Sequence, residues 1–109
     1  MVYSISLKID GKKTNFKVTK TPMFLEITKA TIAREHQMQM YSKDEGPSEK
    51  DFMRNMDLLS EFASLFWNNQ FEAENVTTGA DLKAIESINK AILSCIGVEE
   101  DSNDTESKK

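Results

Sequence analysis

The sequence predicts an α+β fold, mostly α, in which an N-terminal two-stranded β-hairpin packs on three to four helices and a disordered acidic C-terminal tail follows. Three observations predict it. Apolar and polar residues alternate over the first nine positions, which is typical of a half-buried strand. Three later segments repeat apolar residues every three or four positions, which indicates amphipathic helices. The C-terminal residues are polar and charged, and such segments lack the apolar surface that folding requires.

The chain has 109 residues, 39% of them hydrophobic and 29% charged. This length and composition suit one globular domain, which we place at residues 1–97, with the acidic tail at residues 98–109. The chain contains one cysteine, so an internal disulfide is excluded.

The hairpin is predicted at residues 2–19. Tyr3, Ile5, Leu7 and Ile9 share one face of the first strand. Asp10-Gly11 is a strong signal for a two-residue turn, and Phe16 and Val18 restart the alternation. Because a two-stranded hairpin is only marginally stable alone, its apolar face must pack on another element.

A first helix is predicted over about residues 22–41, with Thr21 as its cap and Pro22 at its first position. Five residues fall near one side: Phe24, Ile27, Ala30, Thr31 and Met38. The second half of this helix is polar, so we expect it to be exposed or covered only by a partner.

A second helix is predicted over about residues 48–68, because Ser48 and Asp51 have the spacing of a capping box. Its main apolar stripe consists of Phe52, Met56, Leu59, Ala63 and Phe66. Phe62 and Trp67 widen this stripe, while Leu58 and Leu65 form a second apolar line. A helix that is apolar on more than one side is either central in the fold or offers a face to a partner.

Asn68-Asn69 is predicted to end the second helix, and residues 71–76 are compatible with one short helical turn. A last helix is predicted over about residues 80–96. Its stripe consists of Leu82, Ile85, Ile88, Ile92 and Ile96, and Gly97 is expected to follow it as the C-terminal cap.

No group of residues has the pattern of a catalytic, cofactor-binding or metal-binding site. The single histidine, His36, lies in a polar stretch, and Cys95 lies in the last turn of an apolar helix. No Cys/His spacing fits zinc, and the glycines of a phosphate-binding loop are missing. The sequence therefore predicts a binding protein that is not an enzyme and has no cofactor.

The net charge is −4, and we assign −3 of it to the tail. A nearly neutral body lacks the concentrated basic face of a nucleic-acid-binding protein. Lys12, Lys13, Lys17 and Lys20 are interpreted as a solvated hairpin tip. No apolar run approaches the roughly 20 residues that span a membrane, and the N-terminus lacks the pattern of a signal peptide. We therefore expect a cytoplasmic protein that binds neither nucleic acid nor membrane.

Six methionines is a high number for this length, and flexible methionines recur on surfaces that adapt to apolar partners. In addition, Met23-Phe24-Leu25 covers too wide an arc of a helix to pack in one direction. The candidate partner-binding residues are Met23, Phe24, Leu25, Met38, Met40, Leu58, Leu65, Trp67 and Phe71. The same apolar excess makes self-association into a homo-oligomer plausible.

The order of these pieces resembles a known family. A short hairpin with Ile-Asp-Gly-Lys-Lys is followed by Thr-Pro opening a helix, an apolar helix end and a final Leu/Ile-striped helix. This is similar to the tail assembly chaperones of long-tailed bacteriophages and prophages of Gram-positive bacteria, over about residues 5–97. The most specific piece is Asn69-Gln70-Phe71. The family typically has glycine where this chain has Asn68, and both residues suit a left-handed helix cap.

The resemblance implies a transient protein partner. Such chaperones bind the long, helical tape-measure protein in the host cytoplasm while tail tube protein polymerises round it, and they are absent from the mature virion. Two alternatives stay open at this point. One is a permanent small structural subunit of a phage tail or connector, and the other is a small cytoplasmic adaptor or inhibitor.

Overall fold

The structure is a computed structural model and describes residues 1–98. Two strands, β1 (Val2–Ile9) and β2 (Lys12–Thr19), precede four helices, which are α1 (Phe24–Tyr41), α2 (Glu49–Phe66), α3 (Ala73–Gly79) and α4 (Leu82–Cys95). The predicted fold class, an N-terminal hairpin on a set of helices, is confirmed. The prediction of a disordered acidic tail concerns residues that, apart from Val98, lie outside the described part of the chain.

The strands form the predicted antiparallel hairpin, with Ile9 opposite Lys12. Asp10 and Gly11 both have positive φ, 52° and 79°, as a two-residue turn between twisted strands requires. Ile5 and Leu7 on β1 are buried, as is Val18 on β2. The alternation in the sequence therefore identified the face that packs on the helices.

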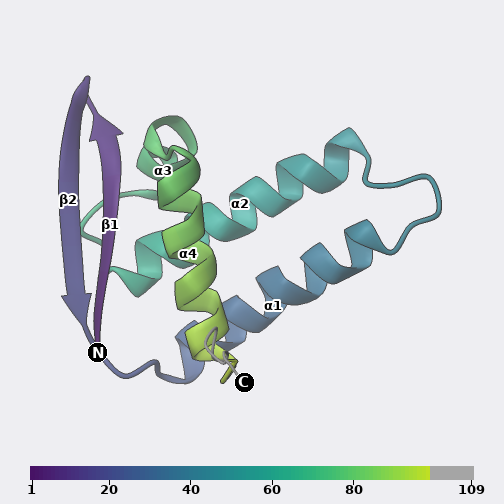
Figure 1. Ribbon diagram of the computed structural model, residues 1–109, viewed down its shortest axis with the longest axis horizontal. Helices are drawn as coiled ribbons and strands as arrows, with labels where there is room; N and C mark the ends of the chain where they lie inside the picture. Colours follow the sequence, from purple (N-terminus) through teal and green to yellow (C-terminus); the bar gives the residue numbers. More distant parts are fainter. Residues whose placement is uncertain (99–109) are drawn as a thin grey trace, which may run out of the picture.

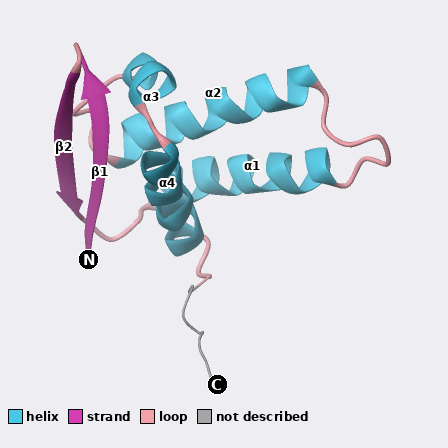
Figure 2. Ribbon diagram, turned by 45° about the horizontal axis from the view of Figure 1, so that its top comes forward, coloured by secondary structure: helices cyan, strands magenta, loops and turns pink. Residues whose placement is uncertain are grey.

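Helices α1 and α2 are antiparallel neighbours that extend together away from the strands (Figure 1). Figure 2 shows the same arrangement from another direction, with the 42–48 loop at the free end of the pair. Helix α4 runs beside β1 and contacts both β1 and α1. The fold thus has a compact end, where strands and all helices meet, and a free end made only by α1, α2 and their loop.

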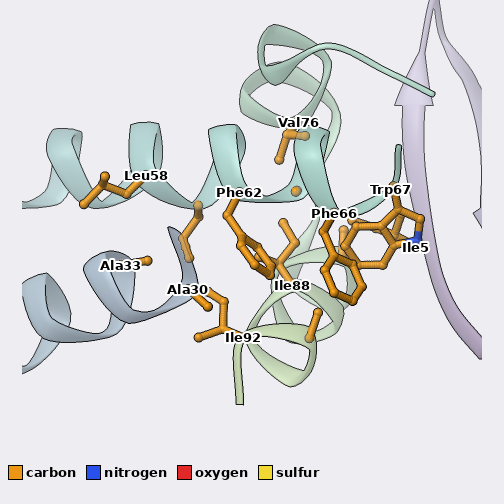
Figure 3. Packing of buried hydrophobic residues seen from close by; sticks show 14 of the residues in the cluster. Ile5, Ala30, Ala33, Leu58, Phe62, Phe66, Trp67, Val76, Ile88 and Ile92 are labelled. Atoms are coloured by element: carbon orange, nitrogen blue, oxygen red, sulfur yellow. The ribbon is translucent and has the colours of Figure 1, made fainter. Parts of the chain in front are cut away.

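The core lies at the compact end, around the C-terminal turns of α2. Phe62, Phe66 and Trp67 have no exposed surface, and Figure 3 shows them next to Ile88 of α4. The Trp67 indole Nε1 donates a hydrogen bond to the carbonyl oxygen of Tyr3 at 3.2 Å. The rings of Tyr3 and Phe66 meet edge to face with centroids 4.8 Å apart. These contacts join the hairpin to the helices.

Helix α1 begins at Phe24, two residues later than the Thr21-Pro22 pattern predicts. The Glu26 carboxylate accepts a hydrogen bond from the backbone N–H of Met23 at 2.8 Å and is paired with the ammonium group of Lys20. That ammonium group lies 5.0 Å from the centroid of the Phe66 ring. The start of the helix is therefore capped by Glu26, which Lys20 holds beside Phe66, and not by Thr21.

The buried side of α1 also differs from the expected one. It consists of Glu26, Ala30, Ala33 and Met40. Phe24 and Met38, which were expected near the packed side, are exposed, as is Thr31. Helix α1 turns its alanine side toward α2, because these small side chains allow the two helices to approach closely.

The ends of the other helices are determined by residues close to them in the sequence. Ser48 Oγ accepts from Asp51 N at 3.2 Å, and the Asp51 carboxylate accepts from Ser48 N at 2.9 Å, so the predicted capping box is present. Helix α2 ends before Asn68, whose φ of 58° is left-handed. The short turn expected at 71–76 is the helix α3. Gly97, with a φ of 83°, follows α4 as expected.

Gly79, at the end of α3, lies directly against β1. A Cβ at this position would overlap the carbonyl oxygen of Lys8 and lie 3.1 Å from its carbonyl carbon. Because backbone atoms cannot move aside without distorting the strand, Gly79→Ala should lower the free energy of unfolding by about 1–3 kcal/mol. Urea denaturation measures this. The exposed neighbouring variant Thr78→Ala should change it by less than about 0.5 kcal/mol, and equal effects of the two would refute the close approach.

Candidate partner-binding surface

Most of the large apolar side chains that remain exposed on α1 and α2 gather in two places, and Ile32, 46% exposed, lies between them on α1. The proximal patch consists of Met23, Phe24 and Leu25, and it includes the most exposed of them, Phe24, at 84%. The distal patch lies at the free end of the α1–α2 pair and consists of Met38, Tyr41, Phe52 and Met53. Leu82, at 71% exposed, lies apart from both at the start of α4.

The structure places the nine sequence-derived candidates in different environments. Met23, Phe24, Leu25 and Met38 are exposed, Leu65 is half-buried, and Met40, Leu58, Trp67 and Phe71 are buried. The buried four pack inside the fold. Leu58 lies on the side of α2 that faces Ala33 of α1 (Figure 3), and Phe71 contacts both Phe16 and Trp67. Only the exposed residues are accessible to a partner in this conformation.

Sequence reasoning missed the part of the distal patch on α2. Phe52 belongs to the same helical stripe as Leu59 and Ala63, and the sequence therefore places it in the core. The structure buries the second half of this stripe and leaves Phe52 exposed, because the first turns of α2 extend beyond the strands and α4. One signal in the sequence could have distinguished the exposed Phe52 from the buried Leu59 and Ala63. The second half of α1 is polar and leaves little apolar surface for Phe52 to pack on.

An aromatic contact and several polar contacts surround the distal patch. The rings of Tyr41 and Phe52 meet edge to face across the helix pair, with centroids 6.4 Å apart. The Lys43 ammonium group lies 2.6 Å from the Asp51 carboxylate, and His36 Nε2 lies 3.0 Å from the Asp51 carbonyl oxygen. The Lys43 hydrogen bond first, and then the Ser48 backbone N–H, lower the pKa of Asp51 to about 2. The apolar side chains are thus presented on an ordered loop end.

A family model described as "Phage tail chaperone protein" matches residues 1–109. The chain belongs to the phage tail chaperone family. No curated protein and no solved structure matches it.

Membership of the family implies protein partners in tail assembly. Together with Ile32, the two patches contain the large apolar side chains of α1 and α2 that no other part of residues 1–98 covers. In the same range, no helix has the length and apolarity needed to cross a membrane.

The single cysteine is placed unfavourably for nucleophilic chemistry. Cys95, the one cysteine of the tail chaperone, is buried. Loss of hydration raises the pKa of its thiol to about 11, and the nearby Glu26 carboxylate adds to the rise. Within residues 1–98, no cluster of His, Cys, Asp or Glu could hold a metal ion.

The lowered pKa of Asp51 predicts a pH dependence of stability. The ordinary pKa of an Asp is about 3.9, so the bound carboxylate stabilises the fold above about pH 4. This contribution is lost as the pH falls toward the folded pKa of about 2. Urea unfolding between pH 4 and pH 2 should therefore show a smaller loss of stability in Asp51→Asn than in the wild type. Lys43→Gln should be intermediate, because the Ser48 contact remains. Identical pH slopes in all three proteins would contradict the assignment.

The raised pKa of Cys95 predicts low thiol reactivity. At pH 8 a thiol with a pKa of about 11 is ionised about two orders of magnitude less than one with a pKa of about 8.5. Ellman's reagent should therefore react slowly with the native protein and promptly with the protein in urea. Fast reaction of one thiol per native chain would show that Cys95 is accessible.

Proposed function

We propose that this tail chaperone transiently binds and solubilises the tape-measure protein while the tail tube polymerises round it, and that it leaves before the virion is complete. The observation that carries the proposal is the pair of exposed apolar patches on α1 and α2 of a phage tail chaperone. The proposal includes the finer points that the family resemblance implies, namely a long-tailed phage or prophage of a Gram-positive host and action in the host cytoplasm without catalysis.

The chemistry of the patches suits an amphipathic helical client. Helices dock on other helices through large apolar anchors spaced by three or four residues. Met38 and Tyr41, three residues apart, provide two such anchors near the end of α1, and Phe24 and Leu25 add two adjacent apolar side chains at its start. Methionine adapts its shape to different apolar neighbours. Several stretches of a long helical client could therefore bind the same surface.

The extent of the surface favours reversible binding. Each patch holds only three or four large apolar side chains, and fully burying one contributes about 1.5–3 kcal/mol before the cost of association. Binding at one site is therefore modest, and tube subunits could displace the chaperone. Several copies along one tape-measure chain would still cover it, because each dissociated copy leaves only its own stretch exposed.

Charging the exposed apolar residues tests the proposal. Phe24→Asp and Met38→Glu place a charge in each patch without touching the core, so unfolding should change by less than about 0.5 kcal/mol. Co-expressed tape-measure protein should then shift from the soluble fraction to the pellet, by several-fold relative to the wild type.

The matched control is Leu82→Glu, which charges an equally exposed apolar residue on α4, outside both patches. It should leave the tape-measure protein soluble. The proposal fails if Phe24→Asp and Met38→Glu fold normally and keep the client soluble, or if Leu82→Glu has the same effect as they have.

A further inference from the structure

The basic charge of this chain is concentrated on its hairpin. Residues 1–20 contain five lysines and one aspartate, a net charge of +4. Residues 21–98 contain seven basic and twelve acidic residues, a net charge of −5. The hairpin is therefore a basic element on an acidic body, and a surface of one sign of charge attracts partners of the other.

Three of these lysines share the face of the hairpin that is turned away from the core. Lys8 lies directly opposite Lys13, and Lys17 lies four residues further along β2, which places it on the same face. Like charges directly opposite each other destabilise a sheet. Within residues 1–98, none of the three lysines forms an ion pair. The fold thus leaves their charge uncompensated, and an acidic partner would compensate it.

The same hairpin has one open edge, the outer side of β2. Figures 1 and 2 show β2 on the outside of the molecule, with β1 between it and the helices. Helices α3 and α4 contact β1, and Gly79 lies directly against the backbone of Lys8. No helix within residues 1–98 borders β2 in this way. An unpaired strand edge presents its N–H and C=O groups to a chain that can pair with it.

The hydrogen-bond pattern identifies the backbone groups of β2 that face outward. The residues on either side of a two-residue turn form a bonded pair, and bonded pairs alternate along an antiparallel ladder. By this alternation, the N–H and C=O groups of Lys13, Asn15 and Lys17 point away from β1. Gln70 Nε2 donates to the Lys17 carbonyl oxygen at 2.9 Å, which agrees with this direction. Gln70 therefore ends the open edge at Lys17, and the groups of Lys13 and Asn15 are left for a partner.

We propose that this edge takes an extended segment of another protein, which adds as an antiparallel strand beside residues 12–17 and alternates acidic and apolar residues. The acidic residues of the segment lie next to Lys13 and Lys17. The apolar residues between them lie on the other face, beside Thr14 and Phe16, which are half-buried. In strand addition the backbone hydrogen bonds provide affinity, and the alternate side chains provide specificity.

A second copy of this chain does not suit the edge. Antiparallel pairing of β2 with β2 of another copy about Asn15 would place Lys13 opposite the second Lys17. Lysines on edge strands commonly prevent self-pairing of this kind. The charge therefore favours an acidic strand over a second copy. This inference does not rest on the proposed function, because it concerns a different face from the α1 and α2 patches.

NMR spectroscopy of the full chain tests the inference, with acetyl-Glu-Val-Glu-Val-Glu-Val-Glu-amide as the probe. In the free protein the amide protons of Thr14 and Phe16 should exchange slowly and those of Lys13 and Asn15 fast, because only the first two pair with β1. Millimolar peptide should shift the Lys13 and Asn15 amide signals and slow their exchange several-fold. The matched peptide with lysine in place of each glutamate should do neither. Unchanged exchange of Lys13 and Asn15 with the glutamate peptide would overturn the proposal.

N-methylated peptides test the strand pairing itself. In antiparallel addition, the residues opposite Lys13 and Asn15 turn their own N–H and C=O groups toward β2, and these residues are glutamates. Methylation of the glutamate nitrogens should therefore abolish the effect. Methylation of the valine nitrogens, which point away from β2, should retain it. Equal binding of the two methylated peptides would show that charge alone holds the peptide, and strand addition would be wrong.

Charge-reversal variants identify the lysines as the cause. Lys13→Glu combined with Lys17→Glu should weaken binding of the glutamate peptide about tenfold, because attractive cross-strand pairs become repulsive. Lys50→Glu combined with Arg54→Glu makes the same change of charge at the start of α2 and should bind as the wild type does. Equal weakening by the two double variants would overturn the proposal. So would slow exchange of Lys13 and Asn15 without peptide, because this chain or a second copy of it would then fill the edge.

Discussion

Three aromatic side chains at the end of α2, Phe62, Phe66 and Trp67, hold the strands and the helices together. None of them retains exposed surface, and burying a side chain of this size contributes about 1.5–3 kcal/mol. The hairpin depends on them because a two-stranded sheet is marginal alone. Trp67 provides its anchor by donating to the Tyr3 carbonyl, and Phe66 provides a second contact through the Tyr3 ring.

The concentration of the core at one end explains the exposure at the other. Helices α1 and α2 extend beyond the aromatic cluster, and there they are covered only by each other. The free end is thus the less stabilised part of the fold, and it also carries the distal patch. Surfaces that bind partners are often of this kind.

Local signals in the sequence predicted much of this fold. The Asp10-Gly11 turn, the Ser48–Asp51 capping box and the left-handed Asn68 each depend on neighbours within a few residues, so the sequence alone locates them. The start of α1 was misplaced because the Thr21-Pro22 pattern was followed, whereas the Glu26 carboxylate accepts from Met23 N and pairs with Lys20. The Lys20 ammonium group in turn lies over Phe66, a contact between residues far apart in the chain.

The candidate surface could be predicted only in part for the same reason. Met23-Phe24-Leu25 spans too wide an arc for one packing direction, and all three side chains are indeed exposed. Trp67 and Phe71 also had the chemistry of partner-binding residues, but the hairpin covers them. Whether an apolar side chain faces a partner or the core depends on which elements pack around it, and helical periodicity carries no information on that.

The central claim is that the exposed sides of α1 and α2 bind the client while the aromatic core stays intact. Hydrogen–deuterium exchange of the chaperone, alone and bound to tape-measure protein, tests it most directly. The account predicts new protection in residues 23–41 and in the first turns of α2, with the amides of α4 and the hairpin unchanged. Protection that falls on the hairpin or α4, with the α1 and α2 amides exchanging as in the free protein, would contradict it.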